Sequence, residues 1–175
     1  MWRWIVGLAG VAVAASASAQ DVIPPPHVRA EREVRRLVDE AARRAPAIRD
    51  SIERLEKLDV TVYVRMKAFT QIDLDGRVAL LSTAGSHRYL VIELACGRSE
   101  LTQMATLGHE LFHAIEIAEE PSVVNADTLA VFYSRIGIKT GDSRGLQTFE
   151  TEEAAAAGLL ARRQLLIRTR HGNGT

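Results

Sequence analysis

The sequence is short of cysteine: Cys96 is the one cysteine among 175 residues. A chain with a single cysteine forms no internal disulfide, and it lacks the clustered thiols that hold structural metal ions. We therefore expect the core to hold without covalent cross-links. Cys96 follows a strand-like apolar run, where a lone cysteine is typical of a small buried side chain.

The chain also lacks an excess of charge of either sign, because 22 lysines and arginines balance 22 aspartates and glutamates. Proteins that bind nucleic acids or anionic membranes usually carry a basic excess. The neutral balance therefore gives no electrostatic basis for either partner. Between residues 28 and 58 the arginines alternate with glutamates such as Glu31 and Glu40, which is typical of a solvated, ion-paired helix face.

No charge-free apolar run is long enough to span a membrane, since the one from Ile5 to Ala15 is too short. That run follows Arg3 and precedes the A-x-A sequence of Ala17, Ser18 and Ala19. This order is typical of a secretory signal peptide cleaved after residue 19. We therefore expect an exported protein, periplasmic or secreted, without a membrane anchor after cleavage.

About 155 residues remain after the signal peptide, enough for one domain with a sizeable core and too few for two ordinary ones. The expected organisation is a signal peptide over 1–19, a proline-rich lead over 20–27, a single domain over 28–170 and a disordered tail over 171–175.

Hydrophobic periodicity and turn residues predict an α+β domain with a small mixed or antiparallel sheet. The expected elements are two helices over 28–58 joined or kinked at Pro46, strands over 60–66, 78–82 and 89–94, a helix over 99–120, a helix capped by Asn125 or Asp127 and ended by Gly137, a polar loop over 138–145, and a last helix over 148–167. The second and third strands are expected to form a hairpin.

The motif with the clearest chemistry is His-Glu-x-x-His at His109, Glu110 and His113. Two histidines four residues apart on a helix lie on one face, where their rings can bind one metal ion. A glutamate beside the first histidine can take a proton from a water on that metal. The surrounding apolar residues recur at helical period, so we expect the motif on a central helix.

A catalytic zinc ion usually has three protein ligands, so one ligand remains to be found. On the motif helix itself, Glu116 shares the histidine face and Glu119 lies one turn further. The acidic start of the last predicted helix offers Glu150 and Glu153 above a series of alanines, whose small side chains allow two helices to approach closely. We favour Glu150, with Glu153 and Glu116 as alternatives.

A β-rich segment, a hairpin, a His-Glu-x-x-His helix and a later helix entered through a glutamate resemble the zincin metallopeptidases. A late glutamate as third ligand resembles the gluzincin branch. The chain is also similar to a group of small exported bacterial proteins that share Arg-Tyr-Leu-x-Ile-Glu-Leu, Gly-His-Glu-Leu-x-His-Ala and Phe-Glu-Thr, here residues 88–94, 108–114 and 149–151. The resemblance covers roughly residues 58–160.

This resemblance implies a zincin-like fold in which the sheet packs on the central motif helix. It implies one zinc ion held by His109, His113 and Glu150, with Glu110 as the general base. It also implies that the strand carrying Tyr89, Val91 and Glu93 is the sheet edge along which an extended peptide pairs.

One position departs from the gluzincin pattern. Many gluzincins have Asp or Asn four residues after the ligand glutamate to orient a histidine, and this chain has Ala154 there. Glu116 is the residue that can supply this support instead.

The function we expect is zinc-dependent hydrolysis of peptide bonds in a peptide or protein substrate, with Glu110 moving the proton. Tyr133, His87 and Arg88 are the candidates for stabilising the oxyanion. The alternative is an exported protein of the same fold that binds zinc without catalysis, or one that is purely structural.

Overall fold

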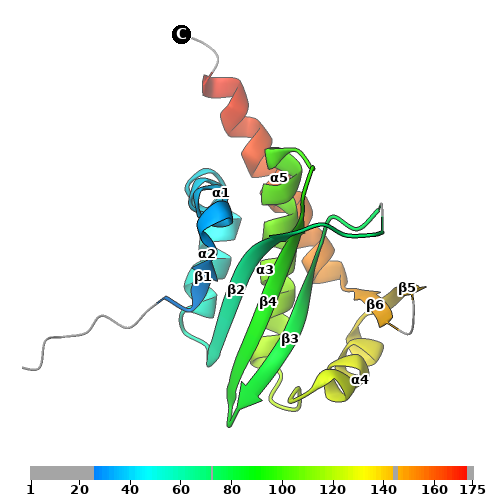
Figure 1. The fold of residues 1–175 in the computed structure, drawn as a ribbon. Coiled ribbons are helices and arrows are strands. Elements are labelled where there is room, and N and C mark those ends of the chain that lie inside the picture. Colours follow the sequence, from blue (N-terminus) through cyan, green and yellow to red (C-terminus); the bar gives the residue numbers. More distant parts are fainter. Residues whose placement is uncertain (1–25, 72, 144–145, 173–175) are drawn as a thin grey trace, which may run out of the picture.

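The structure is a computed structural model, and it describes residues 26–71, 73–143 and 146–172 (Figure 1). The signal peptide predicted over residues 1–19 lies outside the described residues, as does most of the proline-rich lead. No helix in the described ranges combines the length and the apolar character needed to cross a lipid bilayer.

The described residues form five helices, a four-stranded mixed sheet and a separate two-stranded hairpin, which confirms an α+β chain. In chain order the elements are β1 (Val28–Ala30), α1 (Arg32–Arg44), α2 (Pro46–Leu55), β2 (Val60–Lys67), β3 (Gly76–Ala84), β4 (His87–Ala95), α3 (Glu100–Glu119), α4 (Ala126–Ile136), β5 (Ile138–Ser143), β6 (Leu146–Glu150) and α5 (Glu152–Gly172).

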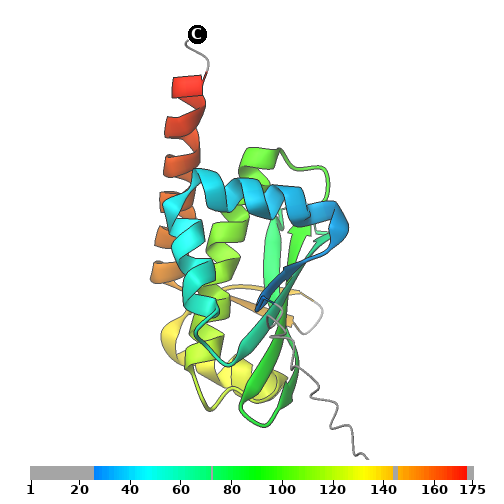
Figure 2. The same ribbon diagram turned by 90° about the vertical axis from the view of Figure 1, so that its left-hand side faces the viewer.

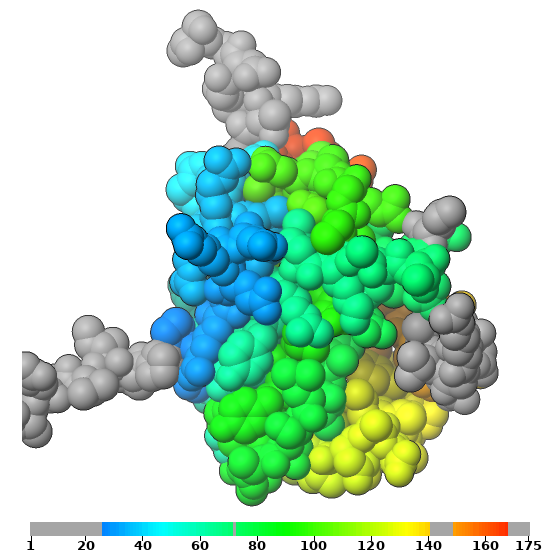
Figure 3. All heavy atoms as spheres, in the orientation of Figure 1, coloured from blue at the N-terminus to red at the C-terminus, as the bar shows by residue number. Residues whose placement is uncertain are grey.

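The main sheet has the strand order β1-β2-β4-β3. β1 and β4 both run parallel to β2, and β3 runs antiparallel to β4. The helices α1, α2, α3 and α5 lie behind one face of this sheet (Figures 1 and 2). No helix of the described residues covers the other face, called the open face below, and the strands β2 to β4 form its middle in the space-filling view (Figure 3). The protein therefore has two layers, with its core between sheet and helices.

The helix α3 is the centre of this core. Ser99 caps it by accepting a hydrogen bond from the Thr102 backbone N–H, at 3.2 Å. Its apolar side chains, among them Leu107 and Leu111, are fully buried. Because α3 is apolar around most of its circumference, the sheet, α2 and α5 can all pack on it.

Two glycines let α5 lie close to α3. A Cβ atom added at Gly108 of α3 would lie 2.7 Å from the Cβ of Ala161, and one added at Gly158 of α5 would lie 3.0 Å from the Cβ of His109. Ala161 is itself fully buried between the helices. The sequence correctly indicated that small residues bring the last helix onto the motif helix.

The beginning of the domain differs from the prediction. Residues 28–30 form the edge strand β1 instead of the start of a helix. The strand pairs in parallel with β2, placing Val28 opposite Val62, and the side chain of Val28 is buried. A three-residue strand next to a helix carries too few alternating residues to be visible in the sequence pattern.

The end of the domain also differs. The predicted polar loop over residues 138–145 contains β5, which pairs with β6 as a hairpin beside the main sheet. The last helix starts at Glu152 instead of residue 148 and continues to Gly172, so residues 171 and 172 of the predicted tail are helical. Cys96 is exposed in the turn that follows β4 and is not part of the core.

Candidate metal centre

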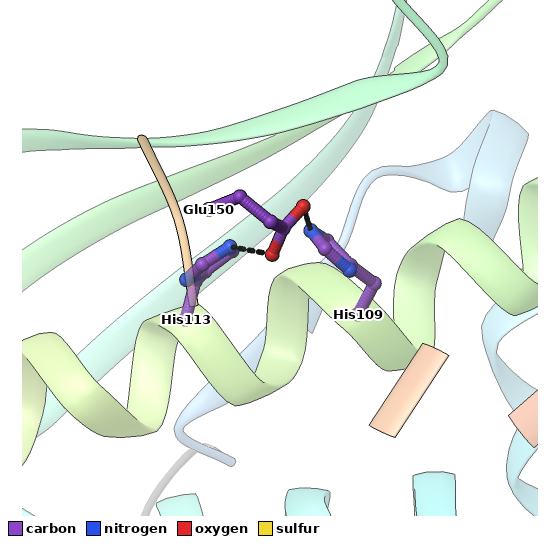
Figure 4. A group of neighbouring side chains, drawn as sticks. All are labelled: His109, His113 and Glu150. Carbon is purple, nitrogen blue, oxygen red and sulfur yellow. Dashed lines mark ion pairs between the residues drawn. The ribbon is translucent and has the colours of Figure 1, made fainter. Parts of the chain in front are cut away.

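His109 and His113 lie one turn apart on α3, as the motif requires (Figure 4). Their ring centroids are 4.8 Å apart and the rings are nearly perpendicular. Both Nε2 atoms point toward the same carboxylate, that of Glu150 (Figure 4). The two imidazoles therefore converge on one position above the helix.

Glu150 is the last residue of β6, and it reaches the histidines from outside any helix. Its Oε2 lies 3.4 Å from the Nε2 of His109, and its Oε1 lies 3.6 Å from the Nε2 of His113. Thr151 follows as the first residue of the turn into α5, where its hydroxyl accepts a hydrogen bond from the Ala154 backbone N–H at 3.2 Å. This cap fixes where the strand ends and the helix begins.

The spacing of these atoms fits a single metal ion. One ligand atom from each of His109, His113 and Glu150 can be chosen so that all three lie within 4.8 Å of one another. Ligands at zinc bond lengths in a tetrahedral site lie about 3.3 Å apart, close to the two histidine–carboxylate distances. Two imidazoles and a carboxylate are also a donor set typical of catalytic zinc. The cluster could hold one metal ion.

Solvent reaches the cluster from one side. The side chains of His109 and Glu150 are 22% and 35% exposed, whereas that of His113 is 7% exposed. A structural metal site is usually closed by four protein ligands, while a catalytic site keeps one position open. The three converging residues and the exposed side leave such a position.

The buried side of the cluster is organised by Glu116. Its Oε2 lies 2.7 Å from the Nδ1 of His113, and its Oε1 accepts a hydrogen bond from the Thr151 hydroxyl, also at 2.7 Å. The hydroxyl of Tyr133 lies 3.3 Å from Glu116 Oε2 and 3.3 Å from His113 Nδ1. A carboxylate at Nδ1 holds the proton there and leaves the Nε2 lone pair free for a metal.

Glu110 lies under the strand β3. It is 5% exposed, and its carboxylate accepts a hydrogen bond from the backbone N–H of Val78. Gly76 permits this close approach, because a Cβ atom there would lie 2.5 Å from the Cγ2 of Thr106 and 3.4 Å from the Oε1 of Glu110. Burial is the largest influence on Glu110 and raises its pKa to about 7.

The cluster residues differ in their affinity for protons. Burial lowers the pKa of His109, and the neighbouring His113 lowers it further. Burial would lower the pKa of His113 too, but hydrogen bonds to Glu116 and Glu150 outweigh it and raise that pKa to about 9. Burial opposes the ionisation of Glu150, yet its hydrogen bond to His113 and the charges of both histidines lower its pKa.

The alternative third ligands lie elsewhere. Glu116 contacts the Nδ1 side of His113 instead of the Nε2 atoms. Glu153 is exposed on α5 and lines a groove together with Phe112. Glu119 forms an ion pair with Arg54 at 2.6 Å. Of the glutamates considered from the sequence, Glu150 is the one in the described cluster.

The candidates for oxyanion stabilisation are engaged in other contacts. The hydroxyl of Tyr133 lies on the Nδ1 side of His113, where burial and Glu116 raise its pKa. The ring of His87 is held between Asp59 and Thr61, at 2.5 and 2.9 Å. The guanidinium of Arg88 is buried and donates to backbone carbonyls, including that of Val123 at 3.0 Å.

The predicted substrate-binding edge is wrong. Tyr89, Val91 and Glu93 belong to β4, which lies between β2 and β3, so its backbone is paired on both sides. The edge on this side of the sheet is β3. The prediction failed because strand order depends on pairing between distant segments, whereas an almost continuously apolar strand is typical of the sheet interior.

Glu93 lies on the open face of the sheet, where it forms ion pairs instead of contacting a peptide. Its side chain is 1% exposed because three cations cover it: Arg65, Lys67 and Arg77. The Lys67 Nζ lies 2.9 Å from the Glu93 carboxylate, and the Arg77 Nε lies 2.7 Å from it. Burial resists ionisation, but these hydrogen bonds prevail and lower the pKa of Glu93 to about 2.

Sequence reasoning missed the role of Thr151, and a signal for it was present. A threonine followed by two glutamates and four alanines is typical of a helix N-cap. Placing the cap at Thr151 would have put Glu150 before the helix instead of inside it.

Comparison with known proteins gives no relative from which a function could be inferred. We found no match among protein-family models, curated proteins or solved structures. The chain therefore carries a candidate His-His-Glu metal centre on a two-layer α+β framework, and its function has to be argued from that centre.

Proposed function

We propose that this protein is a zinc-dependent hydrolase of peptide bonds. The observation that carries the proposal is the convergence of His109, His113 and Glu150 on one position that solvent can reach. Glu110, adjacent to the first ligand in the sequence, supplies the carboxylate that such chemistry needs for proton transfer.

A bound zinc ion supplies a Lewis acid for a carbonyl oxygen and lowers the pKa of a coordinated water toward neutrality. Glu110 takes the proton from the attacking water as the new C–O bond forms. It then gives that proton to the amine nitrogen as the C–N bond breaks.

The edge strand β3 is the element along which an extended peptide would bind. Its partner β4 pairs with one side of it, and the Val78 N–H on the other side points to Glu110. A peptide added to a sheet edge gains backbone hydrogen bonds and presents its carbonyls at regular intervals. A scissile bond bound in this way would lie beside Glu110, which accepts the hydrogen bond from Val78.

A second candidate is an exported protein that binds zinc without catalysis. The observation in its favour is the burial of Glu110, whose carboxylate already accepts a hydrogen bond from Val78. In that case Glu110 ties α3 to β3 and does not transfer protons.

The experiment that separates the candidates compares purified protein with the variant Glu110→Gln. Zinc content is measured by elemental analysis, and cleavage is followed on a library of quenched fluorescent peptides. For the hydrolase, Glu110→Gln keeps one zinc per chain and loses at least about 100-fold in kcat/KM. The matched control is Glu119→Gln on the same helix, which should keep both the bound zinc and the wild-type kcat/KM. Zinc binding with no Glu110-dependent cleavage favours the second candidate.

Export is part of this proposal, and it is tested separately. The signal-like order of Arg3, the apolar run and Ala17-Ser18-Ala19 supports cleavage after residue 19. Expression in a bacterial host followed by N-terminal sequencing of the periplasmic fraction should find a chain that begins at Gln20. Protein that remains in the cytoplasm with its first residues intact would contradict export.

A further inference from the structure

An apolar groove of about 400 Å³ lies between α2 and α5, with α3 as its floor. Figure 2 shows α2 and α5 side by side with α3 behind them. The groove residues are small or apolar apart from a serine and a glutamate; they are Ala47, Ser51, Gly108, Phe112, Glu153, Ala156, Ala157, Leu160 and Ala161. Polar groups that would orient a small ligand are therefore few.

The walls of this groove are held in place. The side-chain oxygen of Gln164 on α5 accepts a hydrogen bond from the Ala47 backbone N–H at 2.9 Å. The Arg44 guanidinium donates to the carbonyl of Leu165, also at 2.9 Å. These contacts join the α1–α2 junction to α5, so the groove is formed before anything binds.

The helix α5 exposes large apolar side chains next to the groove. Leu159 is 69% exposed, Leu160 48%, Leu166 45% and Ile167 51%. The C-terminal half of α5 extends beyond the other helices in both views (Figures 1 and 2). Single exposed leucines are ordinary, but a cluster on one helix beside an apolar groove marks an interaction surface.

The sequence of α5 indicates which partner binds this surface. One face of the helix carries residues spaced by alternating steps of three and four: Glu153, Ala156, Leu160, Arg163 and Ile167. Two copies of this face packed antiparallel, with the helices crossing near residue 158, place Glu153 opposite Arg163 of the second copy. The same register places Ala156 opposite Leu160, a small side chain against a large one.

The charges favour this arrangement over a parallel one. In a parallel pair, Glu153 would face Glu153 and Arg163 would face Arg163, and like charges at such positions are destabilising. Within the described part of the chain, neither residue forms an ion pair, and both are exposed. Each is thus available for the opposite charge of a second copy.

From this geometry we infer that the α2–α5 groove and the adjoining face of α5 form the interface of a symmetric homodimer. The partner is a second copy of the chain, whose Leu160 enters the groove beside Ala156 and Ala157. The interface is isologous, because the same residues contribute from both copies. It shares no residue with the His109, His113 and Glu150 cluster, so it stands independently of the proposed function.

The first test is the molar mass of the purified protein in solution, measured by light scattering and by sedimentation equilibrium at several concentrations. We expect twice the monomer mass at micromolar concentration. Leu160→Glu should give a monomer with an unchanged circular dichroism spectrum. The matched control is Leu81→Glu, a leucine that is 53% exposed on β3, and this variant should remain dimeric.

The second test is a charge exchange, which tests the register. Glu153→Arg alone and Arg163→Glu alone should each raise the dimer dissociation constant at least about tenfold, because each brings like charges together. The double variant restores opposite charges and should recover most of the affinity. A monomeric wild-type protein overturns the inference, and so does a dimer that both single variants and Leu160→Glu leave intact.

Discussion

The Oε2 atom of Glu116 lies 2.7 Å from the Nδ1 atom of His113, one helical turn further along α3. Its other oxygen lies 2.7 Å from the hydroxyl of Thr151, the residue that follows Glu150 of the cluster. One carboxylate therefore orients a histidine of the cluster and anchors the segment that brings in the third residue.

Removing Glu116 should therefore weaken metal binding, although it is not itself a ligand. We expect Glu116→Ala to lower zinc affinity by about 10- to 100-fold, measured by competition with a chromophoric chelator. Glu116→Gln keeps a hydrogen-bond acceptor without the charge, so its zinc affinity should fall between those of Glu116→Ala and the wild type. Glu119→Gln is the control on the same helix. Equal affinity in all four proteins would show that Glu116 does not position His113.

The ligand assignment predicts one zinc ion per chain. His109→Ala, His113→Ala and Glu150→Ala should each lower zinc affinity by more than about 100-fold, because two ligands hold zinc poorly. Isothermal titration calorimetry measures this loss. Glu153→Gln, three residues after Glu150, should bind as the wild type does, and a large loss there would instead favour Glu153 as the ligand.

The lowered pKa of Glu93 predicts that the free energy of unfolding depends on pH in a characteristic way. Its folded-state pKa is about 2, below the ordinary value of 4.5, so its ionised form stabilises the fold at pH above about 4.5. This contribution should disappear as the pH falls toward 2. Glu93→Gln should cost on the order of 3 kcal/mol at pH 7, measured by urea unfolding. The gap between wild type and variant should narrow steadily below pH 4.5, and a gap independent of pH would contradict the assignment.

The contact of α3 with α5 predicts that Gly108→Ala is destabilising. In most helices this change is stabilising by about 1 kcal/mol. Here the new Cβ would lie 2.7 Å from the Cβ of Ala161 and 3.2 Å from the Cγ1 of Ile48, so we expect a net loss of about 1–3 kcal/mol. Thermal and urea unfolding measure the loss. Adding Ala161→Gly should recover part of it, and no recovery would place the strain elsewhere.

The parts of the fold that were predictable from the sequence depend on local pattern. The helix α3 has an N-cap at Ser99 and a long apolar periodicity, and β2 alternates over its whole length. The motif histidines follow directly from that helix. Glu150 was favoured because of the small residues that follow it, and it does lie in the cluster.

The remaining features depend on contacts between distant segments. β1 exists because Val28 can pair opposite Val62, and β5 exists because it pairs with β6. The position of β4 inside the sheet follows from its pairing with both β2 and β3. No local pattern in a single sequence specifies these partners. The contact between Glu116 and His113 is local to α3, but the hydrogen bond that the Thr151 hydroxyl donates to Glu116 arises only once α3 and the start of α5 have met.

The position of Glu150 at the end of β6 has a consequence for a chain with a single cysteine. A metal ion that joins His113 to Glu150 closes a ring of polypeptide around α4 and the β5–β6 hairpin. Such a ring restricts the unfolded chain as a disulfide would, and the restraint is reversible because a chelator can remove it. An ion bound by this cluster would then also hold the C-terminal third of the chain in place.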